Sequence, residues 1–151
     1  MASVGPAVDL DEVRALFVEY HAAVGRPGCF AGFEQELAEL PGDYRPPGGA
    51  LLLARVDGSP AGCAALRAIG ERAGEMKRLY VRPAFRGHGL ARQLTSAIID
   101  ACRTAGHRVL YLDTLPTMTA AIALYGAFGF SPRGAYSAAP TPGALFFERW
   151  L

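Results

Sequence analysis

Two glycines and two arginines stand together in the segment Arg86-Gly87-His88-Gly89-Leu90-Ala91-Arg92. Apolar residues recur at helical spacing after it, at Leu90, Leu94, Ala97, Ile98 and Ala101, which predicts a helix that begins near Leu90. The first amides of a helix have no intrahelical partners and lie at the positive end of its dipole, and glycine lets a phosphate approach the backbone closely. The segment therefore predicts a site for a phosphate-bearing ligand.

A strand is predicted directly before this segment, because residues 76–81 (Met-Lys-Arg-Leu-Tyr-Val) combine apolar alternation with aromatic character. Pro83 ends the strand, since proline has no amide to continue a ladder. Two common phosphate motifs are excluded. The dinucleotide fingerprint needs a glycine where Arg92 stands, and no Gly-Lys-Ser/Thr of a Walker A loop is present.

The pattern Arg86-x-x-Gly89-x-Ala91, placed after Glu75-Met-Lys-Arg-Leu-Tyr-Val-Arg-Pro, resembles motif A of the GNAT superfamily of N-acetyltransferases. That motif holds the pyrophosphate of acetyl-CoA. The resemblance implies that backbone amides of the loop bind the pyrophosphate and that amides near the end of the strand bind the pantetheine and the acetyl oxygen. The cofactor-binding residues expected from it are Leu79, Tyr80, Val81, Arg86, Gly87, His88, Gly89, Leu90, Ala91 and Arg92. CoA would leave as the product, and no metal is expected.

A second resemblance lies nearer the C-terminus, where Leu124-Tyr125-Gly-Ala-Phe-Gly-Phe130 is similar to the L-Y-x-x-x-G-F segment of the same superfamily. The tyrosine of that segment commonly serves as general acid, so Tyr125 is the candidate to protonate the departing thiolate. A phenol with a pKa of about 10 is protonated at neutral pH. The alternative is a tyrosine whose ring packs in the core. The superfamily often has an asparagine six residues before the leucine, and here that position is Met118.

Glu75 is the candidate general base, because several members of the superfamily place a glutamate at the start of this strand. The alternatives are a surface ion pair and a reaction in which water alone takes the proton. Cys63 could suggest an acyl-enzyme, but it lies inside a predicted strand without an obvious base, which favours a core residue. His21, His88 and His107 are interpreted as surface or helix-end residues.

The remaining elements extend the resemblance over nearly the whole chain. Helices are expected over residues 10–24, with Asp9 as the N-cap and a break at residues 25–28, over a shorter stretch from Phe30 to Leu40, and over 116–128. Strands are expected over 50–56, 61–69, 108–114, 130–136 and 145–151, with a turn over residues 70–74 before the central strand. This order matches the GNAT fold, an α/β (α+β) architecture with a mixed, mostly antiparallel sheet of six to seven strands and about four helices. Members of the superfamily usually begin with a strand. Residues 1–8 form a short segment interrupted by glycine and proline, so the sequence does not decide whether this first strand forms.

Length and composition are those of one globular domain, residues 1–151, with 51% hydrophobic and 19% charged residues and a net charge of +1. This charge argues against a nucleic-acid partner. Three cysteines without metal-ligand spacing, and a start without signal-peptide features, favour a cytoplasmic protein with no membrane association. A monomer and a homodimer are both compatible with the sequence.

The two halves of the chain differ in charge. Residues 9–43 carry eight of the fourteen acids, whereas residues 76–110 carry seven bases against one acid. The basic part suits a cofactor with several phosphates, and the acidic part suits a cationic acceptor; the alternative for Glu34, Glu36 and Glu39 is a solvated helix face. We expect the acceptor cleft to be built from the first two helices, with a loop over residues 137–143 as its other wall.

The leading hypothesis is an acetyl-CoA-dependent N-acetyltransferase that acts directly, in a ternary complex, on a primary amine of a small molecule, peptide or protein. The alternatives are a non-catalytic acetyl-CoA-binding module, and an acyltransferase with another acyl donor or a hydroxyl acceptor. The identity of the acceptor lies beyond the sequence.

Overall fold

The structure, a computed structural model, describes residues 1–24 and 32–151. Its helices are α1 (Leu10–Val24), α2 (Phe33–Glu39), α3 (Leu90–Thr104) and α4 (Thr119–Ala127), and its strands are β1 (Ala2–Pro6), β2 (Ala50–Val56), β3 (Ser59–Gly70), β4 (Ala73–Val81), β5 (Val109–Thr114), β6 (Ser131–Arg133) and β7 (Leu145–Trp150). The glycine-rich break predicted at residues 25–28, together with Cys29 and Phe30, lies outside the described residues.

The strands form a seven-stranded sheet in the order β1-β2-β3-β4-β5-β7-β6. Among the strands of the described residues, β4 and β5 alone run parallel, as the strand–helix–strand connection through α3 predicts. The other neighbouring pairs are antiparallel. The predicted α/β fold with a mixed, mostly antiparallel sheet is confirmed, and the first strand, which the sequence left open, is formed and pairs with β2.

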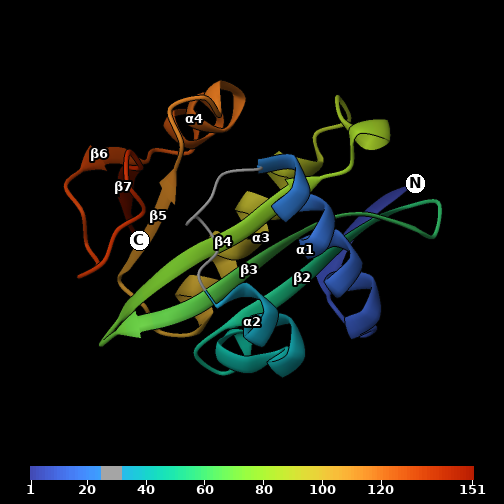
Figure 1. The fold of residues 1–151 in the computed structure, drawn as a ribbon, viewed down its shortest axis with the longest axis horizontal. Helices are drawn as coiled ribbons and strands as arrows, with labels where there is room; N and C mark the ends of the chain where they lie inside the picture. Colours follow the sequence, from blue (N-terminus) through green and yellow to red (C-terminus); the bar gives the residue numbers. More distant parts are fainter. Residues whose placement is uncertain (25–31) are drawn as a thin grey trace.

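Two hydrophobic cores lie on opposite faces of the sheet (Figure 1). The first joins α3 and Tyr125 of α4 to the sheet, and the predicted apolar face of α3 is confirmed because Leu90, Leu94 and Ile98 are at most 1% exposed. The second joins α1 and α2 to the opposite face through Leu16, Phe17 and other apolar residues. Helices thus cover both faces of the central strands.

Several boundaries differ from the sequence prediction. The predicted turn before the central strand is shorter, since β3 extends to Gly70 and β4 begins at Ala73. The last helix begins at Thr119 rather than 116, and β6 keeps only three of the residues expected over 130–136. Strand β6 lies at the edge of the sheet and pairs with β7 from Ser131 to Arg133.

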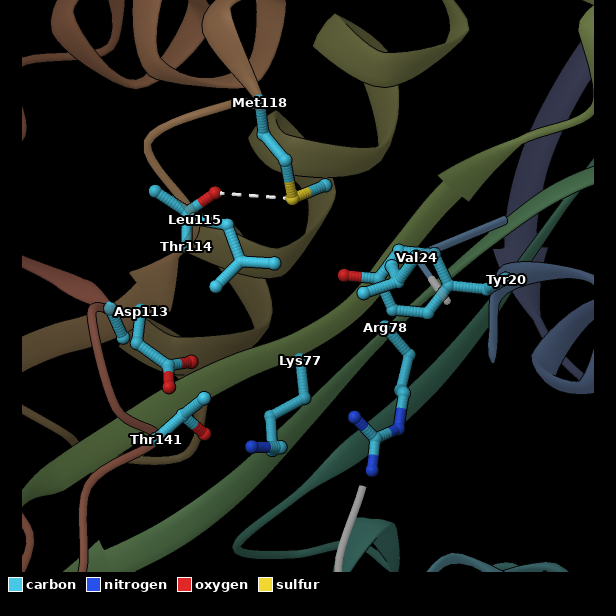
Figure 2. Close-up of a pocket in the computed structure, with 10 residues that line it drawn as sticks. Tyr20, Val24, Lys77, Arg78, Asp113, Thr114, Leu115, Met118 and Thr141 are labelled. Atoms are coloured by element: carbon cyan, nitrogen blue, oxygen red, sulfur yellow. Dashed lines mark hydrogen bonds between the residues drawn. The ribbon is translucent and has the colours of Figure 1, made fainter. Parts of the chain in front are cut away.

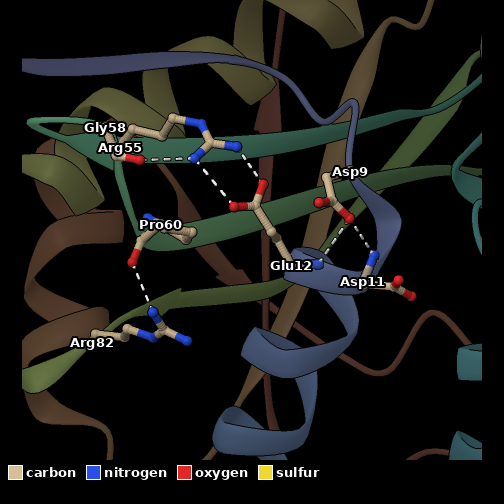
Figure 3. Close-up of polar contacts among 7 residues, drawn as sticks. All are labelled: Asp9, Asp11, Glu12, Arg55, Gly58, Pro60 and Arg82. Carbon is tan, nitrogen blue, oxygen red and sulfur yellow. Dashed lines mark hydrogen bonds and ion pairs between the residues drawn. The ribbon is translucent and has the colours of Figure 1, made fainter.

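The start of α1 shows how local sequence sets an element (Figure 3). The carboxylate of Asp9 accepts hydrogen bonds from the amides of Asp11 and Glu12 at 2.9 and 3.4 Å, which confirms the predicted N-cap. The Glu12 side chain, three residues on, binds the guanidinium of Arg55 on β2 instead of completing a capping box.

Candidate active site

Strands β4 and β5 separate after a short paired stretch, and this separation creates the candidate site. Pairing runs only from Ala73 with Val109 to Glu75 with Tyr111. Beyond it the two strands diverge, and α4 lies at the open end of the sheet (Figure 1). The backbone groups on this side of β4 are therefore available to a ligand.

A β-bulge in β4 accompanies the divergence. Cys63 pairs with Tyr80 and Ala65 with Lys77, so that Arg78 and Leu79 together face the single residue Ala64. Arg78 at the bulge has a φ of +59°, a left-handed conformation that is unusual for a residue other than glycine. The amide of Arg82 donates to Ala61 on β3. By alternation the amide of Val81 points the other way, into the space that β5 has left.

The N-terminus of α3 opens onto the same space. Gly87 and Gly89 have φ angles of +85° and +76°, and an added Cβ would meet no atom within 4 Å at either position. The first backbone hydrogen bond of the helix runs from the amide of Gln93 to Gly89. Within the described part of the chain, the amides of residues 87–92 have no hydrogen-bond acceptor. These amides fit a phosphate group, because the helix dipole adds positive potential there.

A cavity of about 600 Å³ lies against this helix start. It is lined by every cofactor-binding residue expected from the sequence except His88, which is exposed. Its opposite wall was not expected: Ala120, Ala121, Ala123 and Leu124 of α4 line it together with Phe85. The sequence contained a signal for this wall: the side chains of Thr119–Ala127 are mostly small, and alanines along one helix leave room for a ligand.

A second cavity, of about 350 Å³, continues from the first, and Leu79, Tyr80, Val81 and Arg86 line both. Its remaining walls come from the end of α1, at Tyr20, Ala23 and Val24, and from the segment after β5, at Leu115, Thr117 and Met118. Met118 occupies the position where the superfamily often has asparagine. Its sulfur accepts a hydrogen bond of 3.4 Å from the Thr114 hydroxyl.

Tyr125 is buried beside these cavities, with 5% of its surface exposed. It lines a small cavity that shares Tyr20, Leu79 and Met118 with the 350 Å³ cavity. Burial raises the pKa of the Tyr125 phenol well above its ordinary value, and the nearby Tyr20 and Asp113 raise it further. No hydrogen bond from its hydroxyl is found among the residues that the structure describes. The hydroxyl is thus protonated and adjoins a cavity.

Glu75 is 4% exposed and lines none of these cavities. One carboxylate oxygen accepts a 2.7 Å hydrogen bond from the Arg67 guanidinium and lies 3.9 Å from the Lys77 ammonium. The other accepts a hydrogen bond of 2.5 Å from the Tyr136 hydroxyl. Lys77 lines the small cavity that Tyr125 adjoins, whereas Glu75 does not, and no contact between Glu75 and Tyr125 is found among the described residues.

A narrow pocket, with a volume of about 50 Å³, lies where β4 and β5 have separated. Figure 2 shows the side chains that line it. Lys77 and Arg78 reach it from β4, and Asp113 and Thr114 from β5. Tyr20 and Val24 of α1 and Thr141, from the loop expected over residues 137–143, also line it, together with Leu115, Met118 and Ala144. The sequence predicted walls from the first two helices and this loop; the end of α1 and the loop contribute, whereas α2 lines a separate pocket.

Most of the acidic residues on α1 and α2 that face the sheet are paired with arginines. Glu36 accepts two hydrogen bonds, of 2.9 and 2.8 Å, from the Arg78 guanidinium. Glu19 binds Arg82, which also donates to the carbonyl oxygen of Pro60 (Figure 3). Glu36 therefore adds no net negative charge, and a role in attracting a cation stays a prediction for the exposed Glu34 and Glu39.

The cysteine and histidine side chains considered as candidates take part in packing and structural hydrogen bonds. Cys63 is fully buried and its thiol lies 3.3 Å from the carbonyl oxygen of Arg78, and burial raises its pKa far above its ordinary value. The His107 ring donates to the Gly48 carbonyl oxygen at 2.9 Å, and the His21 ring stacks on Phe33. No group of three or more His, Cys, Asp or Glu side chains among residues 1–24 and 32–151 is arranged to hold a metal ion.

No helix in the described ranges combines the length and the apolar character needed to cross a membrane.

Comparisons with known proteins match this geometry. Residues 10–130 match the model of the acetyltransferase (GNAT) family. The chain is 38% identical over 142 residues to an uncharacterised N-acetyltransferase of Schizosaccharomyces pombe, which covers 93% of this chain and 87% of the relative. A solved structure described as an acyl-CoA N-acyltransferase of Klebsiella pneumoniae is 30% identical with a TM-score of 0.81, over 100% of this chain and 98% of that one.

A further solved structure shares the fold at 22% identity, with a TM-score of 0.76 over 99% of this chain and 93% of that one. It is an acetyltransferase of Salmonella typhimurium, determined with its cofactor acetyl-CoA. The family match and the relatives lead to one conclusion: this chain is an acyltransferase that belongs to the acetyltransferase (GNAT) family.

Proposed function

We propose that this protein binds acetyl-CoA and transfers its acetyl group directly to a primary amine of a small molecule, peptide or protein. The observation that carries the proposal is the run of unpaired amides at residues 87–92, which faces a cavity of about 600 Å³ connected by shared walls to the surroundings of Tyr125. A ligand with a pyrophosphate at one end and a reactive group at the other fits this arrangement.

The amides of residues 87–92 would hold the pyrophosphate, with the positive end of the α3 dipole beside it. The Val81 amide, directed into the space between β4 and β5, would donate to the pantetheine or to the carbonyl oxygen as charge develops there. When bound, acetyl-CoA supplies an activated thioester. The protein's contribution is to hold this group and the amine in attack geometry, which supplies part of the lowering of the barrier.

Tyr125 is the proposed general acid, and its raised pKa keeps the phenol protonated until a thiolate is released beside it. Glu75 is the proposed base. Its side chain is buried and lines none of the cavities, so the proton of the amine would reach Glu75 through water. Direct transfer is favoured over an acyl-enzyme because the Cys63 thiol is completely buried, with a pKa raised by burial.

Two measurements test the proposal. Calorimetric titration with acetyl-CoA should show saturable binding, and titration with NAD, which also carries a pyrophosphate, is the control for a general phosphate site. Transfer is then followed as release of free CoA thiol in the presence of a panel of amines. Binding without amine-dependent thiol release for any amine would leave an acetyl-CoA-binding module, and absence of binding would remove the proposal.

A further inference from the structure

The narrow pocket between β4 and β5 contains one group of each charge that is not neutralised by a neighbour (Figure 2). Arg78 lines the pocket, but its charge is balanced by Glu36 at 2.8 Å. Glu75 lies next to Lys77 but does not line the pocket, and its charge is balanced by Arg67 at 2.7 Å. Lys77 then remains as a net positive charge, 3.9 Å from a carboxylate that is already paired.

Asp113 supplies the opposite charge. Its side chain extends from β5 and lines the pocket together with Lys77 and Thr141. No ion pair within 4.0 Å involves its carboxylate in residues 1–24 and 32–151. It also lies in the wall of the small cavity that Tyr125 lines, and it raises the pKa of that tyrosine through its negative charge. Asp113 is thus an unpaired carboxylate close to the expected site of transfer.

The Asp113 carboxylate and the Lys77 ammonium are partly buried and do not pair with each other. Together they match a ligand that carries one positive and one negative charge. The Lys77 side chain is 19% exposed, so a charged group that reaches it is largely removed from water, where an ion pair is stronger than at a surface. The small volume of about 50 Å³ limits the ligand to a compact head group.

We propose that the acceptor is a free α-amino acid, whose amine is bound by Asp113 and whose carboxylate is bound by Lys77. This inference rests on the proposed function. Asp113 and Lys77 both line the small cavity that Tyr125 lines, so the bound amino acid would lie beside the proposed general acid. A peptide N-terminus has a carbonyl group where the amino acid has its carboxylate, and it would therefore lack the contact with Lys77.

The test uses matched acceptors and the wild-type protein. Common α-amino acids and their carboxamides are compared by CoA thiol release at fixed, saturating acetyl-CoA. The amide keeps the amine and the side chain and removes the negative charge. Because this change also lowers the pKa of the acceptor amine, each pair is compared over a range of pH. Because a hydrogen bond to a charged group is lost, kcat/KM for the preferred amino acid should exceed that for its amide about tenfold or more. Equal values, or a preference for amides or peptides, would overturn the inference and leave the proposed function intact.

Variants identify the residues responsible. Lys77→Met should raise KM for the amino acid about tenfold or more and change KM for the amide less than about twofold, whereas Lys77→Arg should restore the preference. Asp113→Asn should raise KM for both acceptors, since both carry the amine. Each variant is first titrated with acetyl-CoA, and unchanged binding shows that its fold and cofactor site are intact.

If the variants fail to fold, the comparison of amino acid and amide in the wild type decides alone. Acetyl-CoA binding with no thiol release for any free amino acid would overturn the inference without touching the cofactor site. Failure of the wild type to bind acetyl-CoA would instead be a failure of the proposed function.

Discussion

The Glu75 carboxylate accepts a 2.5 Å hydrogen bond from the Tyr136 hydroxyl, which comes from a residue 61 positions later in the chain. This contact joins the paired part of β4 to the segment after β6, and the Tyr136 ring also stacks on Tyr111 of β5 at 4.9 Å. Together with the hydrogen bond from Arg67, it fixes the orientation of the Glu75 carboxylate. If Glu75 is the base, the proton of the amine would reach it through water, because Glu75 lines none of the cavities.

Substitution of Glu75 tests its role. Glu75→Gln keeps the shape of the side chain and removes its charge, so kcat should fall about 10²-fold if Glu75 receives the proton of the amine. Tyr136→Phe is the matched control, because it removes the hydrogen bond and keeps the carboxylate; its kcat should stay within about threefold of wild type. A lower free energy of unfolding for Glu75→Gln with normal turnover per folded molecule would show that Glu75 is structural.

Tyr125→Phe removes one hydroxyl and keeps the ring. Turnover should fall about 10²-fold or more if the hydroxyl protonates the thiolate, while acetyl-CoA affinity changes little because the phosphate-binding amides belong to other elements. The melting temperature should change little, since no partner of this hydroxyl is found among the described residues. The control is Tyr44→Phe, which changes a tyrosine that is 3% exposed and lines the separate pocket beside α2. A kcat for Tyr125→Phe within about twofold of wild type would exclude Tyr125 as the acid.

The pH dependence of turnover gives a second test of Tyr125. Its pKa in the folded protein is raised by burial, so the protonated acid should persist above the ordinary phenol pKa of about 10. For the same reason, the stability that this group contributes is present below about pH 10 and is lost as the pH rises further. Below pH 10, kcat should therefore depend on pH in the same way in wild type and in Tyr125→Phe. A fall centred near neutral pH that Tyr125→Phe abolishes would contradict the raised pKa.

Gly89→Val should abolish acetyl-CoA binding, because a branched side chain would occupy the approach to the amides of α3. The φ of +76° at Gly89 means that valine also strains the backbone, so loss of binding alone would not be decisive. Gly106→Val provides the control at the other end of the same helix: φ is +86° and an added Cβ would also meet no atom within 4 Å. Both variants should lose similar stability by chemical denaturation, but only Gly89→Val should lose binding. Wild-type affinity in Gly89→Val would place the pyrophosphate elsewhere.

Glu36→Gln should destabilise the fold, because it removes the carboxylate charge that pairs with the guanidinium of Arg78, whose side chain is 8% exposed. The Glu36 side chain is 24% exposed, so we expect a loss of about 2 kcal/mol, below the 3–5 kcal/mol typical of a fully buried pair. Glu34→Gln, on the exposed side of the same helix, should change the free energy of unfolding by less than about 0.5 kcal/mol. Urea denaturation of both variants measures the difference, and equal losses would show that the Arg78 contact contributes little.

The sequence by itself determined the features that depend on neighbouring residues. The Asp9 cap, the end of β4 before Pro83 and the glycine-bearing start of α3 arise from hydrogen-bonding and steric preferences within a few residues, and the structure confirms each of them. The order of strands and helices followed from the same local patterns. It also determined that β4 and β5 run parallel, because a single helix connects them.

The tertiary structure decided which distant side chains meet. The pairing of Glu36 with Arg78 spans 42 positions, and that of Glu19 with Arg82 spans 63. Charge counts along the sequence therefore predicted an acidic acceptor site from residues that the fold partly neutralises. The pocket of Lys77 and Asp113 was equally hidden, because it exists only where β4 and β5 separate. That separation depends on the register of the whole sheet and on the bulge at Arg78, which no local pattern encodes.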